Sequence, residues 1–235
     1  MGCRLIYTVK LKANGSIKRY KARSVAKEYR QRYGVGYQET FAPIAKIDTI
    51  RLLLSLAENL DWPLHQFDVK NAFLHRDLAE KIYMDLPLGC NLAPEEKNQV
   101  CKCIKSLCGL KQSLNAWFGR FTKSMKNFGY TQNNSDDTLF LKCDEGNITA
   151  LIVYVDDIVV TGNDTREQHK LQKYLSQQFE MKDLGTLKKF HEIELARLET
   201  GTFLSHGKYL MDVHTKTRML GCKHADTSIE INHKL

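Results

Sequence analysis

The chain has 235 residues, of which 43% are hydrophobic and 26% are charged, so its composition excludes a disordered segment and fits one large globular domain or two small ones. Its apolar runs fall far short of the roughly 18 residues that indicate a membrane span, and no charged-then-apolar signal peptide opens the chain. The sequence therefore predicts an intracellular protein without a membrane segment.

Most of the net charge of +8 lies near the N-terminus. Residues 1–38 carry ten Lys or Arg and a single acid, Glu28, so this segment is +9 and the other 197 residues sum to −1. A basic arm on a nearly neutral body indicates a polyanionic partner, with nucleic acid as the leading one. A solvated charged hairpin is the simpler alternative.

The first predicted element is a β-hairpin. Residues 4–12 and 16–27 are typical of strands, and Asn14-Gly15 between them is a strong hairpin turn signal. Lys21 and Arg23 share one face of the second strand, because side chains alternate with a period of two. These cations form either an ordinary solvent face or a pair that points to phosphates.

A helix and a strand are predicted next. Asp48 is expected to cap a helix over about 49–60, where apolar residues recur at helical spacing. Leu64–Val69 is typical of a strand, and 81–86 of another short strand.

The second half of the chain alternates between predicted strands and helices. From Leu64 onward the order is strand, helix, strand, strand, helix, strand, which is compatible with a ferredoxin-like sheet with helices on one face. Ser113 is expected to cap the first of these helices. The predicted elements are a helix from Ser113 to Phe128, strands over 138–142, 148–155 and 158–161, a helix over 165–179, a hairpin over 190–196 and 202–205, and a last helix over 207–219.

Two adjacent acids, Asp156 and Asp157, lie between apolar runs at 150–153 and 158–160. Each run is typical of a buried strand, so the acids are expected at the tight turn of a hairpin. Adjacent carboxylates there repel each other and lose hydration, which a hard cation such as Mg²⁺ would compensate. A plain Asp-Asp turn explains the same pattern equally well when it is taken alone.

In a ferredoxin-like sheet, the strand that ends at Asp68 can lie beside the hairpin that carries Asp156 and Asp157. Three carboxylates would then converge at one end of the sheet and suggest a two-metal site. Phosphoryl transfer at such a site needs positioning and charge neutralisation more than covalent help from the protein. The same trio could also serve a two-metal nuclease.

Several short blocks, in the same order along nearly the whole chain, resemble those of reverse transcriptases from copia-type LTR retrotransposons. As an ordered set they are highly specific. The central blocks are Phe67–Leu74, Gly109–Ser113 and Tyr154–Asp157, and the others are Arg19–Arg23, Glu39–Pro43 and Ser135-Asp136 ahead of Leu139-Phe140.

The resemblance implies an α+β right-hand polymerase whose palm is a ferredoxin-like antiparallel sheet with helices on one face. Its expected partners are an RNA or DNA template-primer and deoxynucleoside triphosphates, and its oligomeric state stays open. As one reverse transcriptase domain over 1–235, the chain would comprise fingers (about 1–63 and 75–112), palm (64–74 and 113–198) and a partial thumb or connection (199–235).

The resemblance also implies a metal site. Asp68 and Asp156 would be the principal ligands of Mg²⁺, or of Mn²⁺, with Asp157 as a third acid. The backbone carbonyl of Val69 would also face the metal.

Further residues acquire implied roles in nucleotide binding. Lys21 and Arg23 would neutralise the triphosphate, and Gln112 would contact the incoming nucleotide. Phe73 would exclude the sugar 2′-hydroxyl, with core packing as an equal alternative. The segment 190–195 resembles the hairpin that grips the primer end.

The chain departs from the family pattern at scattered positions, so a catalytically inactive remnant that binds nucleic acid is the alternative function. Two of the changes remove a cation beside Gln112 and add an acid to the primer-grip segment. The positions are Glu28, Arg76, Cys108, Leu114, Asn115, Asp137, His191 and Glu192.

Overall fold

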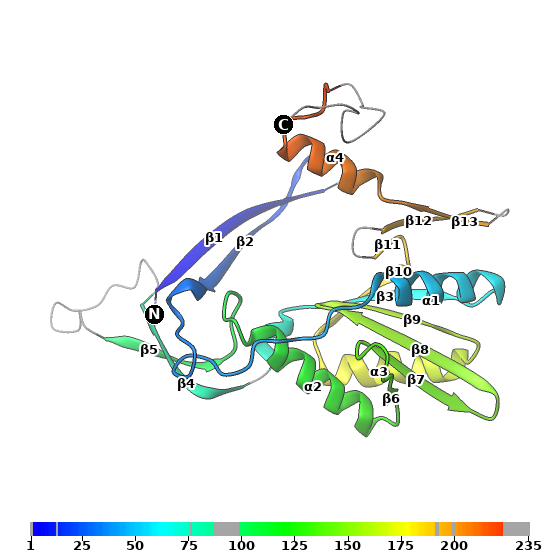
Figure 1. Ribbon diagram of the computed structural model, residues 1–235, viewed down its shortest axis with the longest axis horizontal. Helices are drawn as coiled ribbons and strands as arrows, with labels where there is room; N and C mark the ends of the chain where they lie inside the picture. The colour runs from blue at the N-terminus through cyan, green and yellow to red at the C-terminus, as the bar shows by residue number, and fades with distance from the viewer. Residues whose placement is uncertain are drawn as a thin grey trace, which may run out of the picture. The chain divides into compact units, whose positions relative to one another are not determined.

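The computed structural model describes residues 2–12, 14–75, 77–86, 99–190, 193–198 and 201–222 (Figure 1). The chain separates into two compact units, Met1–Thr186 and Leu187–Leu235. It combines helices with antiparallel strands, as predicted for an α+β protein. Among the helices of these ranges, none is long and apolar enough to cross a membrane.

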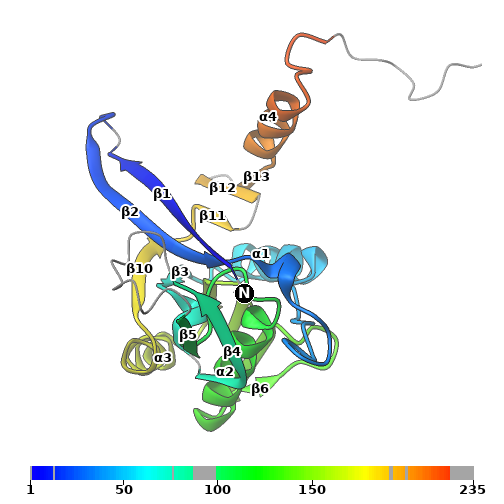
Figure 2. The same cartoon turned by 90° about the vertical axis from the view of Figure 1, so that its left-hand side faces the viewer.

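An N-terminal β-hairpin projects from the first unit (Figure 2). Its strands β1 (Cys3–Leu11) and β2 (Ile17–Ala26) pair antiparallel and form a two-stranded sheet of their own. The side chain of Asn14 accepts hydrogen bonds from the N–H and the hydroxyl of Ser16 at 3.1 and 2.7 Å, and Gly15 has a φ of +79°. The predicted Asn-Gly turn is therefore confirmed.

A six-stranded antiparallel sheet forms the centre of the first unit. Its strands are β3 (Leu64–Val69), β6 (Thr131–Gln132), β7 (Leu139–Asp144), β8 (Asn147–Tyr154), β9 (Asp157–Gly162) and β10 (Met181–Thr186), in the spatial order β10-β3-β9-β8-β7-β6. The helices α2 (Ser113–Asn127) and α3 (Thr165–Gln178) complete the order β3, α2, β8, β9, α3, β10. This is the predicted ferredoxin-like arrangement, with β6 and β7 added at one edge, but its last strand is β10 and not the strand predicted over 190–196, because β11 and β12 belong to a separate sheet.

The outermost strand of this arrangement, β10, was not predicted. Its residues are mostly exposed or half-buried, and its register against β3 shifts between Asp183 and Gly185. An edge strand with charged residues, a glycine and a bulge lacks the alternation of apolar residues that identifies a half-buried strand. Sequence reasoning therefore left 181–186 unassigned.

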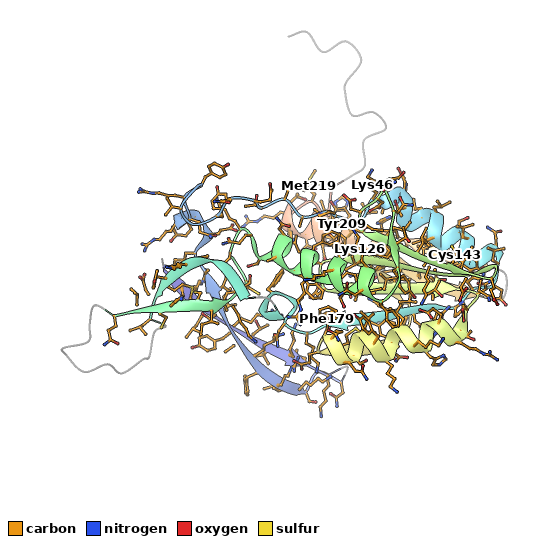
Figure 3. The ribbon with its side chains drawn as sticks, turned by 90° about the horizontal axis from the view of Figure 1, so that it is seen from below. Lys46, Lys126, Cys143, Phe179, Tyr209 and Met219 are labelled. Carbon is orange, nitrogen blue, oxygen red and sulfur yellow. The ribbon has the colours of Figure 1, made fainter. Side chains whose placement is uncertain are left out.

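Helices cover both faces of the sheet. On one face, Trp117 and Phe121 of α2 pack with Leu171 and Leu175 of α3 against strand residues such as Val153. Phe179, labelled in Figure 3, follows α3 and closes this core against α2. The helix α1 (Ile47–Asn59) lies on the opposite face, so the prediction of helices on one face describes α2 and α3 only (Figure 1).

Both predicted helix caps are wrong by one or two residues. Helix α1 has Lys46 at its N-cap, and the N–H of Lys46 donates to Asp136 at 3.0 Å, so Asp48 lies inside the first turn. Helix α2 has Gln112 at its N-cap. The Ser113 hydroxyl instead donates to the Leu107 carbonyl at 2.6 Å. Neither N-cap residue makes a side-chain cap hydrogen bond, so the local caps that the sequence suggested are absent from both helices.

A second antiparallel ribbon joins the hairpin base to the loop before α2. Its strands are β4 (Asp77–Asp85) and β5 (Val100–Lys105), so β4 begins earlier than the predicted strand over 81–86. A small apolar cluster links this ribbon to the end of β2. Its buried members are Ala26, Ile82, Met84, Cys103 and Leu110. Two 3-10 turns, η1 (Glu28–Arg30) and η2 (Ala72–His75), complete the described connections.

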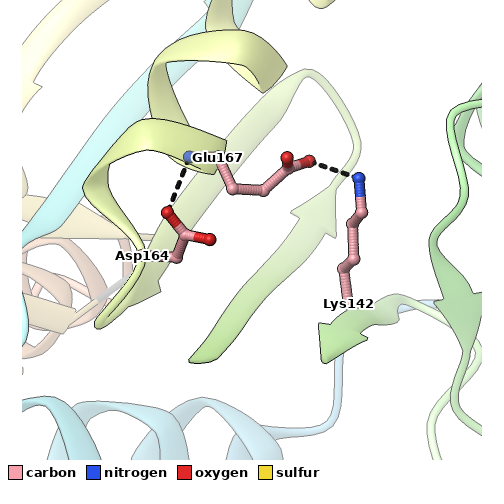
Figure 4. A network of polar contacts seen from close by, with 3 residues as sticks. All are labelled: Lys142, Asp164 and Glu167. Carbon is pink, nitrogen blue, oxygen red and sulfur yellow. Dashed lines mark hydrogen bonds and ion pairs between the residues drawn. The ribbon is translucent and has the colours of Figure 1, made fainter. Parts of the chain in front are cut away.

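A polar network holds α3 against β7 (Figure 4). Asp164 caps α3 by accepting the N–H of Glu167 at 2.9 Å, and the Glu167 carboxylate pairs with the Lys142 ammonium at 2.9 Å. Lys142 also lies over the ring of Phe128, 5.1 Å from its centroid. Glu167 is buried, so a charge on its carboxylate carries a desolvation cost, and the ion pair with Lys142 offsets that cost.

The second unit contains a short antiparallel sheet and a helix. Its elements are β11 (Lys189–Phe190), β12 (Ile193–Leu198), β13 (Gly201–Ser205) and α4 (Gly207–Lys216). The pairing of β12 with β13 confirms the predicted hairpin, and α4 confirms the last helix. Phe190 and Ile193 are buried, whereas positions 191 and 192 lie outside the described residues.

Candidate active site

The candidate acids lie at one end of the central sheet. Asp68, near the end of β3, is the direct antiparallel partner of Asp157, the first residue of β9. Directly opposed side chains point to the same face, with Cβ atoms about 5 Å apart. Asp156 precedes Asp157 in the tight turn whose flanking pair is Tyr154 and Asp157. The structure therefore brings the three predicted acids to one sheet end.

The turn that carries Asp156 has an unusual backbone. Val155 has a φ of +55°, a left-handed conformation that is unfavourable for a β-branched residue. Two hydrogen bonds hold the turn from different elements. The N–H of Val69 donates to the Asp156 carbonyl at 2.8 Å, and the indole N–H of Trp117 donates to the Val155 carbonyl at 2.6 Å.

The acids are electrostatically unfavourable without a cation. Loss of hydration raises the pKa of Asp156, the Asp68 carboxylate raises it further, and Arg23 and Lys21 oppose the rise. Loss of hydration also raises the pKa of Asp157, although a hydrogen bond from Gln66 at 3.1 Å opposes this shift. A divalent cation would relieve the repulsion and favour the ionised carboxylates.

The carboxylates at this sheet end are the type of ligand that a hard divalent metal takes. Among the residues that the structure describes, no group of three or more Asp, Glu, His or Cys side chains is arranged so that it could hold a metal ion. Mg²⁺ is usually bound by one or two carboxylates together with water and substrate phosphates. Asp68 and Asp156 are the carboxylates predicted for this role, and Val69 is the next residue on β3.

One face of the β1–β2 hairpin is cationic. Lys21 is paired with Thr8, and Arg23 with Ile6, so both cations share the face of Lys10 and Arg19. Loss of hydration and the cations at 23, 19 and 10 lower the pKa of Lys21, whereas Asp68 raises it. Arg23 and Lys21 in turn lower the pKa of Asp156.

Gln112 is buried, with 4% of its surface exposed, and its amide is bonded within the protein. Its NH₂ group donates to the Gly36 carbonyl at 3.0 Å, and its carbonyl accepts from the Gln31 amide at 3.0 Å. The Gln31 carbonyl in turn accepts the N–H of Lys111 at 2.9 Å. Gln112 thus fastens the loop before α2 to the segment after the hairpin, and its contact with a nucleotide stays a prediction.

Phe73 lies in η2, five residues after Asp68, and its half-buried ring packs against the central core cluster. This position is compatible with both roles inferred from the sequence, because a half-exposed ring can support the core and also present an edge to a ligand.

Three residues of the site escaped sequence reasoning as individuals. Gln31 carries no motif, and Trp117 has the spacing of a core residue of α2. Gly109 appeared only as part of a block, yet its φ is +84° and the Cys108 carbonyl beside it accepts the N–H of Ala26 at 2.9 Å. The groups concerned are a buried amide, an indole N–H and a glycine. The role of each can be recognised only when its distant partner in the fold is known.

The departures from the family pattern are scattered in the structure as well. Glu28 is exposed at the start of η1, Leu114 and Asn115 are half-buried, and the Asp137 side chain is exposed. Positions 76, 191 and 192 lie outside the described residues.

Comparison with known proteins identifies the family. The family described as "Reverse transcriptase (RNA-dependent DNA polymerase)" matches residues 1–231. Over its whole length, the chain is 41% identical to the "Retrovirus-related Pol polyprotein from transposon RE1" of Arabidopsis thaliana and covers 16% of that protein. It is 38% identical to the corresponding polyprotein from transposon TNT 1-94 of Nicotiana tabacum, with 99% of the chain matched to 18% of the relative.

The chain thus spans about a sixth of the length of these relatives. The match nevertheless runs through the sheet that carries the acids and through the basic hairpin. As the ordered sequence blocks predicted, the chain belongs to the reverse transcriptase family, among the Pol polyproteins of copia-type retrotransposons.

Proposed function

We propose that this chain is an RNA-directed DNA polymerase domain that extends a primer 3′-OH with deoxynucleotides in the presence of Mg²⁺ or Mn²⁺. The observation that carries the proposal is the pairing of Asp68 with Asp157 beside the Asp156 turn, within reach of the charges of Lys21 and Arg23. In this proposal the six-stranded sheet with α2 and α3 is the palm, and the β1–β2 and β4–β5 ribbons belong to the fingers.

Each residue has a defined task in this reaction. Asp68 and Asp156 would hold the divalent ions, whose chemistry would be activation of the attacking hydroxyl and stabilisation of the leaving phosphate. Asp157 is kept in place by Gln66 and adds negative charge at the same sheet end. Lys21 and Arg23 bind the triphosphate, because phosphoryl transfer depends on orienting and neutralising that group.

Primer extension on an RNA template tests the proposal directly. The expected product with Mg²⁺ or Mn²⁺ and deoxynucleotides is a ladder of longer primers. A chain that binds template-primer without extending it would contradict the polymerase proposal and support the non-catalytic alternative. Shortened strands would indicate a nuclease.

The double substitution Lys21→Ala and Arg23→Ala is expected to raise the KM for deoxynucleotides by roughly tenfold or more, because charge-assisted bonds to phosphate are lost. Steady-state extension with varied nucleotide concentration measures this change. The matched control is Lys12→Ala with Lys18→Ala, which removes the same charge near the hairpin tip. A KM that rises equally in both variants would show that only general charge matters.

Phe73→Ala separates the two roles of the Phe73 ring. If the ring excludes the 2′-hydroxyl, the preference for deoxynucleotides over ribonucleotides should fall by at least about tenfold, since an exclusion contact is lost. Competition between the two nucleotide types during extension measures this preference. A lower melting temperature with unchanged preference would assign Phe73 to core packing alone.

A further inference from the structure

We propose that Trp117 is a positioning residue that holds the Tyr154–Asp157 turn in the conformation that presents Asp156 to the metal. The indole N–H has a single hydrogen to donate, and it donates it to the Val155 carbonyl at 2.6 Å. The role in the reaction rests on the proposed polymerase function, whereas the hold on the turn is a property of the fold.

The turn needs such a hold because its backbone is strained. Val155 is β-branched and has a φ of +55°, so relaxation of this residue would move it towards negative φ. That movement would rotate the peptide that leads into Asp156. The N–H of Val69, on β3, binds the Asp156 carbonyl and so holds the second peptide of the turn. The preceding carbonyl, that of Val155, accepts its hydrogen bond from the Trp117 indole.

Trp117 is itself held rigidly. It is 1% exposed, its ring centroid lies 5.6 Å from that of Phe121, and it meets Phe179 edge-on at 5.1 Å. A buried indole usually places its N–H against an acceptor. A rigid donor in the core of α2 is therefore directed at the one left-handed residue of the turn that bears the acids.

The activity test compares Trp117→Phe with Met125→Ala. The first keeps an aromatic ring but removes the N–H, whereas the second removes the side chain of another buried member of the same core cluster, two turns further along α2. We expect Trp117→Phe to lower kcat by about tenfold to 100-fold, with the KM for nucleotide changed by less than about threefold, because misplacement of a reacting group acts on the chemical step. Met125→Ala should lower the melting temperature and leave kcat near the wild-type value.

A spectroscopic readout tests the same hold without turnover. The chain has two tryptophans, so Trp62→Phe leaves Trp117 as the only one. In this variant, Mn²⁺ should change the Trp117 emission, and Asp156→Asn should remove the change. If the wild-type chain fails to extend primers but shows this metal-dependent emission, the polymerase proposal falls while the hold on the turn stands.

Two results would overturn the role of Trp117. One is a wild-type kcat in Trp117→Phe. The other is a loss of kcat that is in proportion to the loss of stability in both Trp117→Phe and Met125→Ala, which would reduce Trp117 to a core residue.

Discussion

Asp156→Asn is expected to abolish primer extension, with a fall in kcat of roughly a thousandfold or more. The reason is that the site loses a negative charge that would hold the metal ion bound to the reacting phosphates. Asn is nearly the same size as Asp, and the Asp156 backbone bond to Val69 does not involve the side chain. The variant should therefore fold normally. Single-turnover extension on an RNA template measures the loss.

The matched control is Asp137→Asn, which removes one negative charge from an exposed side chain outside the acid site. It should extend primers at the wild-type rate. Extension by Asp156→Asn at a rate close to that of this control would remove Asp156 from the metal site.

The same substitution should change how metal-free stability depends on pH. The folded-state pKa of Asp156 is raised, so the folded protein binds more protons than the unfolded chain between the usual Asp pKa and this raised value. Stability in EDTA should therefore fall as the pH rises through that window. Asp156→Asn should show a smaller fall, and thermal melts at stepped pH would measure the difference.

Gly109→Ala is expected to cause a large loss of folding stability. An added Cβ would lie 2.4 Å from the Ala26 carbonyl oxygen and 2.7 Å from a methyl carbon of Val25, and the φ of +84° is itself unfavourable for alanine. Overpacking against rigid backbone and the strain of a left-handed alanine together predict that the free energy of unfolding falls by about 2–4 kcal/mol. Urea unfolding of the variant measures it.

Gly146→Ala provides the matched control for this effect. Gly146 has a similar φ of +82°, but an added Cβ would meet nothing within 4 Å. The free energy of unfolding of Gly146→Ala should therefore fall only by the cost of left-handed strain, about 1–2 kcal/mol. Equal losses in the two variants would contradict the close packing of Gly109 against the end of β2.

Gly109→Ala should also reduce nucleotide binding. The backbone bond from Ala26 to Cys108 joins the hairpin base to the loop before α2, and Lys21 and Arg23 lie on the same strand as Ala26. Loss of this hydrogen bond would move Lys21 and Arg23 away from Asp68 and Asp156. The same extension assay should therefore show a raised KM for nucleotide.

Local patterns were sufficient to predict the elements with strong periodicity or turn signals. The Asn14-Gly15 hairpin and the apolar runs around Asp156 each depend on neighbouring residues alone, and both appear where they were predicted. The opposition of Asp68 and Asp157 followed once a ferredoxin-like order was assumed, because that order fixes which strands are neighbours.

What the sequence did not predict depends on distant partners. Strand β10 is an edge with little apolar alternation, so only its pairing with β3 identifies it. Ser113 looked like a cap, but its hydroxyl is bonded to the Leu107 carbonyl. Trp117 has the spacing of a core residue, and no local signal reveals that its N–H reaches a turn 38 residues away.

The most direct test of the shared metal site is a Mn²⁺ titration followed by electron paramagnetic resonance, with template-primer and a deoxynucleotide present. The wild-type chain should bind Mn²⁺, and Asp68→Asn and Asp156→Asn should each weaken that binding by at least about tenfold, the equivalent of 1.4 kcal/mol for a lost ligand charge. Unchanged Mn²⁺ affinity in Asp68→Asn would show that β3 and the β8–β9 turn do not hold one metal site, and would contradict the account.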